Sequence, residues 1–289
     1  MPIPLAEIRV TGLLGGDRHE LPPRLGPTLR GVLGLTLRDL DRSGYDLLFE
    51  GRRSGRDLPF EPPQPMLLRL PAQWQPREQT STTTAGTLSF GIRLLGPAVT
   101  HWRLVARALA EAGRRGLGKP RLPWALTHVV DAFTDQPLAE NDPVDALSVH
   151  HPAVPASELI GQTLRWRFIT PIRVREEGRI RAAPDGLTLL LATRRRLDLL
   201  RRAWGTATTH PPPWHECRRF DAHEFRTLQS DTQTVQLPRF SLRTKRSNTF
   251  YATAGSVTIQ GPWAEVPWLL LANVYHLGKS TSFGFGRVQ

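Results

Sequence analysis

The feature that most constrains the fold is an order of helices and strands that occurs twice along the chain. In the first half, the spacing of apolar residues predicts strand, helix, strand, helix and strand, at about 7–10, 27–40, 87–95, 102–112 and 122–130. In the second half it predicts strand, helix, two strands and helix, at about 164–170, 187–204, 234–242, 251–259 and 263–277. A glycine-rich loop and a last strand then close the chain.

A unit of helix, glycine turn and strand therefore occurs at about 99–130 and again at 263–288. The element order of each half is the split βαβ arrangement of a ferredoxin-like fold. We predict an α+β protein with two tandem ferredoxin-like (RRM-like) domains.

A change of pattern in the middle of the chain predicts the domain boundary. Residues 134–160 replace the periodic pattern with acidic and proline-rich turns. We expect an N-terminal domain at 1–133, a linker at 134–160 and a C-terminal domain at 161–289, which contains the glycine-rich loop. The stretch 43–76 is rich in Pro, Gly and Arg and is predicted to be irregular.

The charge balance indicates a polyanionic partner. The 38 Lys and Arg residues exceed the 26 Asp and Glu residues, which gives a net charge of +12. Such a surface attracts nucleic acid first and acidic membranes second. Most of the positive charge is arginine, which pairs in bidentate fashion with phosphate and guanine. A GC-rich genome would also favour arginine over lysine, but it would not explain the net charge.

The cysteine and histidine pattern argues against a metal site. Cys217 is the only cysteine, so no disulfide can form within the chain and no Cys-based zinc site is possible. The nine histidines show no HxxxH or HExxH spacing, and the adjacent His150 and His151 are predicted to lie in a loop. We expect no cofactor and metal-independent chemistry. The single cysteine fits a reducing cytoplasm, where we expect the protein to act. No apolar run approaches the roughly 18 residues that span a bilayer, so we expect no membrane partner.

The C-terminal loop, 278–287, combines glycines with one lysine and three hydroxyl residues. Glycines let backbone N–H groups approach an anion, and Lys279 adds charge beside them. The GxxxxGK[ST] order of a P-loop is absent. The residues alone leave two interpretations open, an anion-binding loop and a tight turn that fixes the last strand.

This loop, Gly278-Lys279-Ser280-Thr281-Ser282-Phe283-Gly284-Phe285-Gly286-Arg287, resembles the C-terminal signature of the CRISPR-associated pre-crRNA-processing endoribonucleases of the RAMP superfamily. Three other segments resemble the family in the same order: 29–34, 116–118 and 239–241. The resemblance implies two ferredoxin-like domains, recognition of a repeat hairpin and metal-independent cleavage. It also implies that the processed RNA is retained and enters an effector complex, so we expect CRISPR repeat RNA and other effector-complex subunits as partners.

Three basic segments are candidates for RNA contact. The first is the helix near Thr193, where a solvated helix face is the alternative interpretation. The second is the strand pair around residue 240, and the third is the C-terminal loop. The candidate RNA-binding residues are Arg194, Arg195, Arg201, Arg202, Arg239, Arg243, Lys245, Arg246, Lys279, Ser280, Thr281, Ser282 and Arg287. A-form RNA is read largely through its shape and backbone, which suits charged stripes of this kind.

Metal-free cleavage uses the 2′-OH of the RNA as nucleophile, with groups that move protons and cations that stabilise the transition state. The family commonly places a histidine in or before its first helix, but the helix at 28–40 has none. His19, in the loop before it, is one candidate for proton transfer. Arg24, Arg30 and Arg38 are the other candidates and would act through orientation and electrostatics, because arginine stays charged.

The function predicted from the sequence is therefore a hairpin-specific endoribonuclease of CRISPR immunity. A non-catalytic RAMP subunit that binds crRNA is the alternative, and the missing helix histidine favours it. A general basic RNA-binding protein is a third possibility.

Overall fold

The computed structural model describes most of the chain: residues 3–15, 25–52, 58–71, 86–118, 121–152, 163–176, 178–205, 226–241, 246–261 and 266–289. Within these residues, no helix is both long and apolar enough to cross a membrane.

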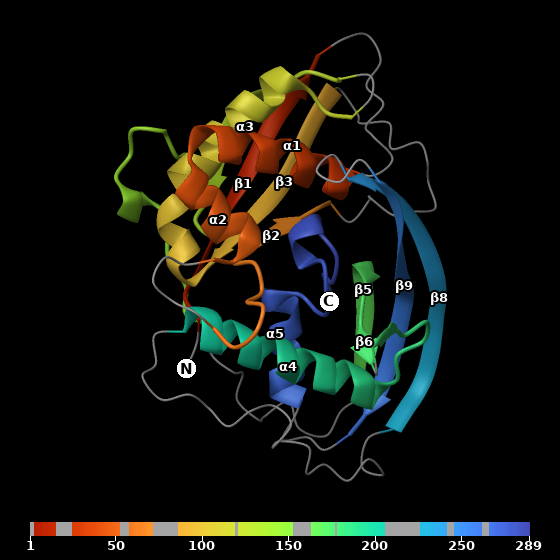
Figure 1. Cartoon of the computed structure of the whole chain (residues 1–289). Coiled ribbons are helices and arrows are strands. Elements are labelled where there is room, and N and C mark those ends of the chain that lie inside the picture. Colours follow the sequence, from red (N-terminus) through yellow and green to blue (C-terminus); the bar gives the residue numbers. More distant parts are fainter. Residues whose placement is uncertain are drawn as a thin grey trace.

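The first half forms a four-stranded antiparallel sheet with the strand order β2-β3-β1-β4. The strands are β1 (Leu5–Leu14), β2 (Met66–Arg69), β3 (Thr87–Leu95) and β4 (Trp124–Asp131). Helices α1 (Leu25–Leu40), α2 (Arg42–Glu50) and α3 (Trp102–Arg115) lie together on one face of this sheet (Figure 1). Strand order and helix placement are those of a ferredoxin-like domain with one additional helix.

The prediction that 43–76 is irregular is wrong, because this stretch contains both α2 and β2. Asp41 caps α2 by accepting a hydrogen bond from the Gly44 amide at 3.0 Å, and Gly51 ends it in the left-handed conformation at φ 67°. These capping signals flank a helix of only nine residues, and β2 has only four. Neither element is long enough to show a clear hydrophobic period.

The second half repeats the same topology. Its sheet has the order β5-β9-β8, formed by β5 (Leu164–Ile172), β9 (Arg246–Gln260) and β8 (Arg226–Ser241). The last residues of the chain add to the free edge of β5, because Arg167 and Gln289 exchange backbone hydrogen bonds of 2.9 Å and Phe168 pairs with Val288. Helices α4 (Gly186–Trp204) and α5 (Val266–Tyr275) and the short pair β6 (Arg175–Glu176) and β7 (Arg179–Ile180) complete this half. The predicted fold class, α+β with tandem ferredoxin-like domains, is thus confirmed.

The second half packs on the face of the first sheet that its helices leave uncovered. Along β1, Ala6 and Ile8 point into the helix-covered core, whereas Leu5 joins a separate cluster with residues of α4 and α5. The members of this interdomain cluster are Ile3, Leu5, Leu47, Leu67, Leu95, Leu197, Leu200, Ala203, Trp204, Leu271 and Tyr275. Two hydrogen bonds support it, from Trp204 Nε1 to Pro63 O at 2.8 Å and from the Tyr275 hydroxyl to Ile3 O at 3.0 Å.

The first part of the predicted linker follows the surface of the first half. The indole of Trp102 donates to Val144 O at 2.9 Å, and the Asp131 carboxylate accepts from the Ser148 amide at 2.8 Å. Leu5 and His150 exchange backbone hydrogen bonds, so the linker is attached to the first half as far along the chain as His150. The division at 134–160 stays a prediction, since 153–162 lie outside the described residues.

Candidate functional site

The C-terminal glycine loop lies at the junction of the two halves and contacts the first half directly. A Cβ atom added to Gly26, near the start of α1, would lie 2.1 Å from Phe283 O, and one added to Gly284 would lie 2.6 Å from the Leu70 side chain. Gly284 and Gly286 have φ values of 88° and 81°, which side chains other than glycine rarely adopt. The glycines therefore allow both the turn and the close approach to α1 and β2.

Three consecutive hydroxyl groups of the loop each accept a hydrogen bond from a different arginine. Arg173, just after β5, donates to Ser280 at 2.5 Å. Arg196 of α4 donates to Thr281 and Arg30 of α1 donates to Ser282, both at 3.0 Å. Side chains from both halves of the chain thus fix the loop. Within it, Ser280 has a φ of 63°, which is uncommon for a residue other than glycine. RNA contact by Ser280, Thr281 and Ser282 stays a prediction, since these oxygens already have partners.

Arg30 is enclosed as well as hydrogen-bonded. Its guanidinium carbon lies 4.7 Å from the centre of the Phe49 ring and 4.3 Å from that of Phe283. Arg38, by contrast, is exposed at the other end of α1, where its Nε lies 3.9 Å from Asp39 Oδ1. Eight residues of helix separate the two arginines by roughly 12 Å. The structure therefore does not bring Arg30 and Arg38 together, and the other two catalytic candidates, His19 and Arg24, lie outside the described residues.

The arginines of α4 have different surroundings. Arg196 is buried, donates to Tyr275 O at 2.8 Å, and has its pKa lowered by burial to about 10. The guanidinium carbon of Arg202 lies 4.9 Å from the centre of the Phe60 ring, and its Nη1 lies 3.8 Å from Asp198 Oδ2. Arg195 is exposed, whereas Arg194 and Arg201 are partly buried.

Besides Arg196, the structure brings a second α4 arginine, Arg195, close to the glycine loop. The pKa of Lys279 is lowered by partial burial and by the positive charges of Arg175, Arg195 and Arg173, against the opposing effect of Glu61. Two segments that the sequence predicted separately, α4 and the loop, therefore contribute to one cationic surface.

The third predicted RNA-binding segment is the end of the β8–β9 hairpin. The backbone pairs Arg239 with Asn248 and Ser241 with Arg246, so both arginines lie near the hairpin end. Arg243 and Lys245 fall outside the described residues.

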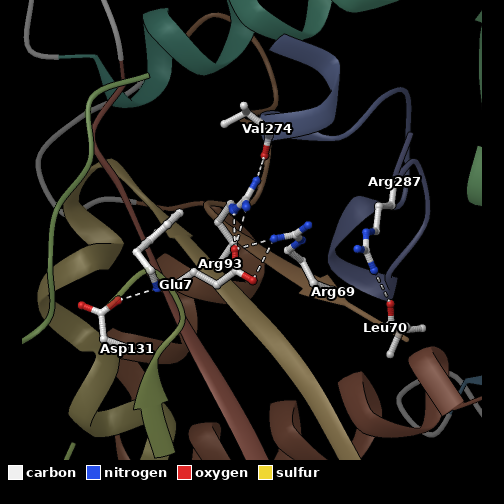
Figure 2. Close-up of polar contacts among 8 residues, drawn as sticks. Glu7, Arg69, Leu70, Arg93, Asp131, Val274 and Arg287 are labelled. Carbon is white, nitrogen blue, oxygen red and sulfur yellow. Dashed lines mark hydrogen bonds and ion pairs between the residues drawn. The ribbon is translucent and has the colours of Figure 1, made fainter. Parts of the chain in front are cut away.

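Sequence reasoning missed a charged network at the interface of the halves (Figure 2). Glu7 of β1 accepts hydrogen bonds from Arg93 of β3 at 2.6 Å and from Arg69 of β2 at 2.8 Å. Arg93 also donates to Val274 O of the second half, and Arg287 donates to Leu70 O of the first half at 2.9 Å. One signal was present in the sequence, because Glu7 lies between the apolar Ala6 and Ile8, and Arg93 lies between Ile92 and Leu94.

His276 is also part of this region and was missed. It is 1% exposed at a φ of 58°, and its Nδ1 lies 3.1 Å from Phe285 O. Burial, with Arg93 and Arg69 nearby, holds its pKa well below the usual value. The imidazole is therefore neutral near pH 7.

Two family models match consecutive parts of the chain. A model described as an N-terminal domain (AF_1859_N) matches residues 3–151, and the model of the CRISPR-associated endoribonuclease Cas6 matches residues 166–288, which include the whole glycine loop. The second half of the chain is thus similar to Cas6 endoribonucleases. This confirms the family resemblance that was based on the loop.

Solved Cas6 structures share the fold over the full length. A Cas6 (TTHB231) product complex aligns with a TM-score of 0.60 at 15% identity and covers 100% of this chain and 99% of the other. Thermus thermophilus Cas6 (TTHB231) aligns at 0.56 with 14% identity, covering 100% and 98%. A Cas6 (TTHA0078) product complex aligns at 0.52 with 20% identity, covering 99% and 98%. The comparison with curated proteins finds no match.

Proposed function

We propose that this protein is a metal-independent endoribonuclease of the Cas6 family that binds and cleaves repeat hairpins of precursor CRISPR RNA in the cytoplasm. We further propose that it retains the processed RNA for an effector complex with other subunits. The observation that carries the proposal is the glycine loop, which three arginines from α1, α4 and the end of β5 hold between the two halves. A loop fixed in this way can present its backbone and Lys279 to a polyanion without ordering on binding.

The cationic surface around this loop supports RNA as the ligand. Partial burial and the charges of Arg175, Arg195 and Arg173 lower the pKa of Lys279, so its charged form is unfavourable there unless an anion offsets the repulsion. Phosphate groups of an RNA backbone supply that negative charge, and the net charge of +12 gives long-range attraction. The remaining α4 arginines and the end of the β8–β9 hairpin extend the proposed RNA-binding surface.

The proposed reaction is attack of the RNA 2′-OH on the adjacent phosphate. The bond from phosphorus to the 5′-oxygen breaks, and the products carry a 2′,3′-cyclic phosphate and a 5′-OH. We place the cutting centre beside α1 and the segment before it, with His19, Arg24 and Arg38 as the groups that contact the scissile phosphate. Arg30 was predicted among these groups, but its contacts with Ser282, Phe49 and Phe283 favour a role in holding the loop to α1.

A non-catalytic crRNA-binding subunit is the second candidate function. Two observations favour it: α1 carries no histidine, and one of its two candidate arginines is engaged in packing. This function needs the same RNA-binding surface but no group that moves a proton.

Incubation of the purified protein with labelled repeat RNA in EDTA tests the proposal. We expect a single cut in the repeat and no cut in an RNA of the same composition whose stem cannot form. Tight binding without any cut would support the non-catalytic subunit, and equal binding of both RNAs would contradict repeat recognition.

Single-turnover rates of alanine variants locate the cutting centre. If His19 moves a proton, His19→Ala should lower the rate by roughly 100-fold or more and leave binding unchanged. If the arginines dominate, Arg38→Ala should cause the larger loss, with a smaller effect from Arg24→Ala. If these three variants and Arg30→Ala all cut at the wild-type rate, the cutting centre lies elsewhere in the protein. Lys279 would then be the next residue to replace.

A further inference from the structure

The interface between the two halves contains three guanidinium groups and one carboxylate. Glu7 binds Arg69 and Arg93, and Arg287 enters from the last segment of the chain. Figure 2 draws Arg69 beside Arg287, and the two charges are close enough that Arg69 lowers the pKa of Arg287, second only to burial. Arginine does not neutralise by losing its proton in proteins. The cluster therefore has an excess of two positive charges in a partly dry environment.

The three arginines differ in how fully their donors are used. Arg93 directs Nε and Nη2 at Glu7 and Nη1 at Val274 O, so each of its nitrogens has an acceptor. Arg69 uses Nη1 for both oxygens of Glu7, while its Nε is buried without a partner among the described residues. Arg287 uses Nη1 for Leu70 O, and its other nitrogens have no acceptor within the part of the chain that the structure describes.

The same cluster remains open to a ligand. About a fifth of the Arg69 side chain (21%) is exposed, and Arg287 is only partly buried. On β3, the residue next to Arg69 is Gly91, where an added Cβ would lie 2.8 Å from Glu7 Oε1 and 3.1 Å from Arg69 Cβ. Glycine at this position leaves the space in which Arg69 reaches Glu7 with Nη1.

We propose that Arg69 and Arg287 form a binding site for a phosphoryl group at the interface of the two halves, which in the RNA complex holds one backbone phosphate. Guanidinium groups bind phosphate oxygens through paired, charge-assisted hydrogen bonds, and two of them can hold one phosphate from two sides. Because Arg69 belongs to the first half and Arg287 to the second, the bound phosphate also links the halves. As an RNA site this inference rests on the proposed function.

The variants that test this site are chosen to change the surrounding packing as little as possible. Arg287→Met keeps the aliphatic stem and removes the guanidinium. Arg69→Lys keeps a positive charge opposite Glu7 but lacks Nε and the planar fork. Arg114→Met is the control, because it removes one charge from a highly exposed residue of α3. Circular dichroism spectra and melting temperatures of the variants in chloride establish that each is folded.

Two measurements then distinguish the sources of the phosphoryl group. In the first, inorganic phosphate replaces chloride at constant ionic strength, and the melting temperature is recorded. We expect wild type and Arg114→Met to be stabilised by phosphate, and Arg287→Met and Arg69→Lys to lose most of this shift. In the second, repeat RNA is titrated at several salt concentrations. Arg287→Met should lower the magnitude of the slope of log affinity against log salt by roughly 0.7 to 0.9 relative to Arg114→Met.

The outcomes separate the site from the proposed function. If Arg287→Met and Arg114→Met give the same phosphate shift and the same salt slope, the site is overturned, whether or not the wild type cuts RNA. If the wild type fails to bind repeat RNA but shows a phosphate shift that depends on Arg287 and Arg69, the phosphoryl site is supported and the proposed function fails.

Discussion

Arg30→Met and Ser282→Ala separate the two ways in which Arg30 holds the glycine loop to α1. The hydrogen bond from Arg30 to Ser282 is 3.0 Å long, and the rings of Phe49 and Phe283 enclose the guanidinium group. A hydrogen bond with one charged partner contributes about 1.5–3 kcal/mol, and a cation–π contact contributes about 0.5–2 kcal/mol. We therefore expect Ser282→Ala to lower the free energy of unfolding by about 1.5 kcal/mol and Arg30→Met by about 3 kcal/mol.

The double variant measures the coupling between the two residues. Once Arg30 is Met, the Ser282 hydroxyl loses the one donor that it has among the described residues, so the double variant should be about as stable as Arg30→Met alone. The expected coupling energy is about 1.5 kcal/mol. Urea titration followed by tryptophan fluorescence gives these values.

Ser280→Ala is the matched control for this cycle, because Ser280 accepts from Arg173. Its effect should add to that of Arg30→Met within about 0.5 kcal/mol. If the effects of Arg30→Met and Ser282→Ala on the free energy of unfolding also add within about 0.5 kcal/mol, Arg30 does not hold the loop to α1 through Ser282.

Three further predictions concern α4 and the interface. Replacing Arg194 and Arg195 with alanine should reduce the magnitude of the slope of log affinity against log salt by roughly 0.7 to 0.9 for each phosphate that the variant no longer binds. An unchanged slope in filter-binding titrations would show that these two arginines belong to a solvated helix face. Thr281→Val should cost about 1.5–3 kcal/mol in thermal or urea unfolding, because it removes an acceptor from buried Arg196; a change below about 0.5 kcal/mol would argue against this hydrogen bond. Because the pKa of His276 is lowered in the folded state, its effect on stability is absent above pH 6.5, and stability falls below that pH by up to about 1.4 kcal/mol per unit. His276→Asn, which tolerates a positive φ, should flatten this fall between pH 6.5 and 5, and an unchanged profile would contradict the assignment.

The elements that sequence predicted well are those with a sustained hydrophobic period. The predicted strand 87–95 is β3, and the predicted helix 27–40 is α1 extended by two residues at its start. In α1, buried Leu29, Leu33 and Leu37 recur at four-residue spacing, so the pattern alone specifies one core-facing side. The repeated order of such elements was enough to predict both ferredoxin-like domains.

The parts that sequence could not predict depend on contacts between distant residues. Arg30 was a catalytic candidate because it lies on a basic stripe of α1, and only the position of Ser282, 252 residues later, shows its packing role. Glu7 and Arg93 lie 86 residues apart, and their pairing follows from the register of β1 and β3. Of the predicted RNA-binding residues, Arg195 and Lys279 are brought together by the packing of the loop against α4, which no local pattern encodes.

The most direct test of the account is cleavage of repeat RNA that carries a single 2′-deoxy nucleotide at the cut site, measured in EDTA beside the unmodified RNA. The account predicts that both RNAs bind equally, that only the unmodified one is cut, and that its upstream product ends in a 2′,3′-cyclic phosphate. Cleavage of the 2′-deoxy RNA, or cleavage that appears only after Mg²⁺ is added, would contradict it.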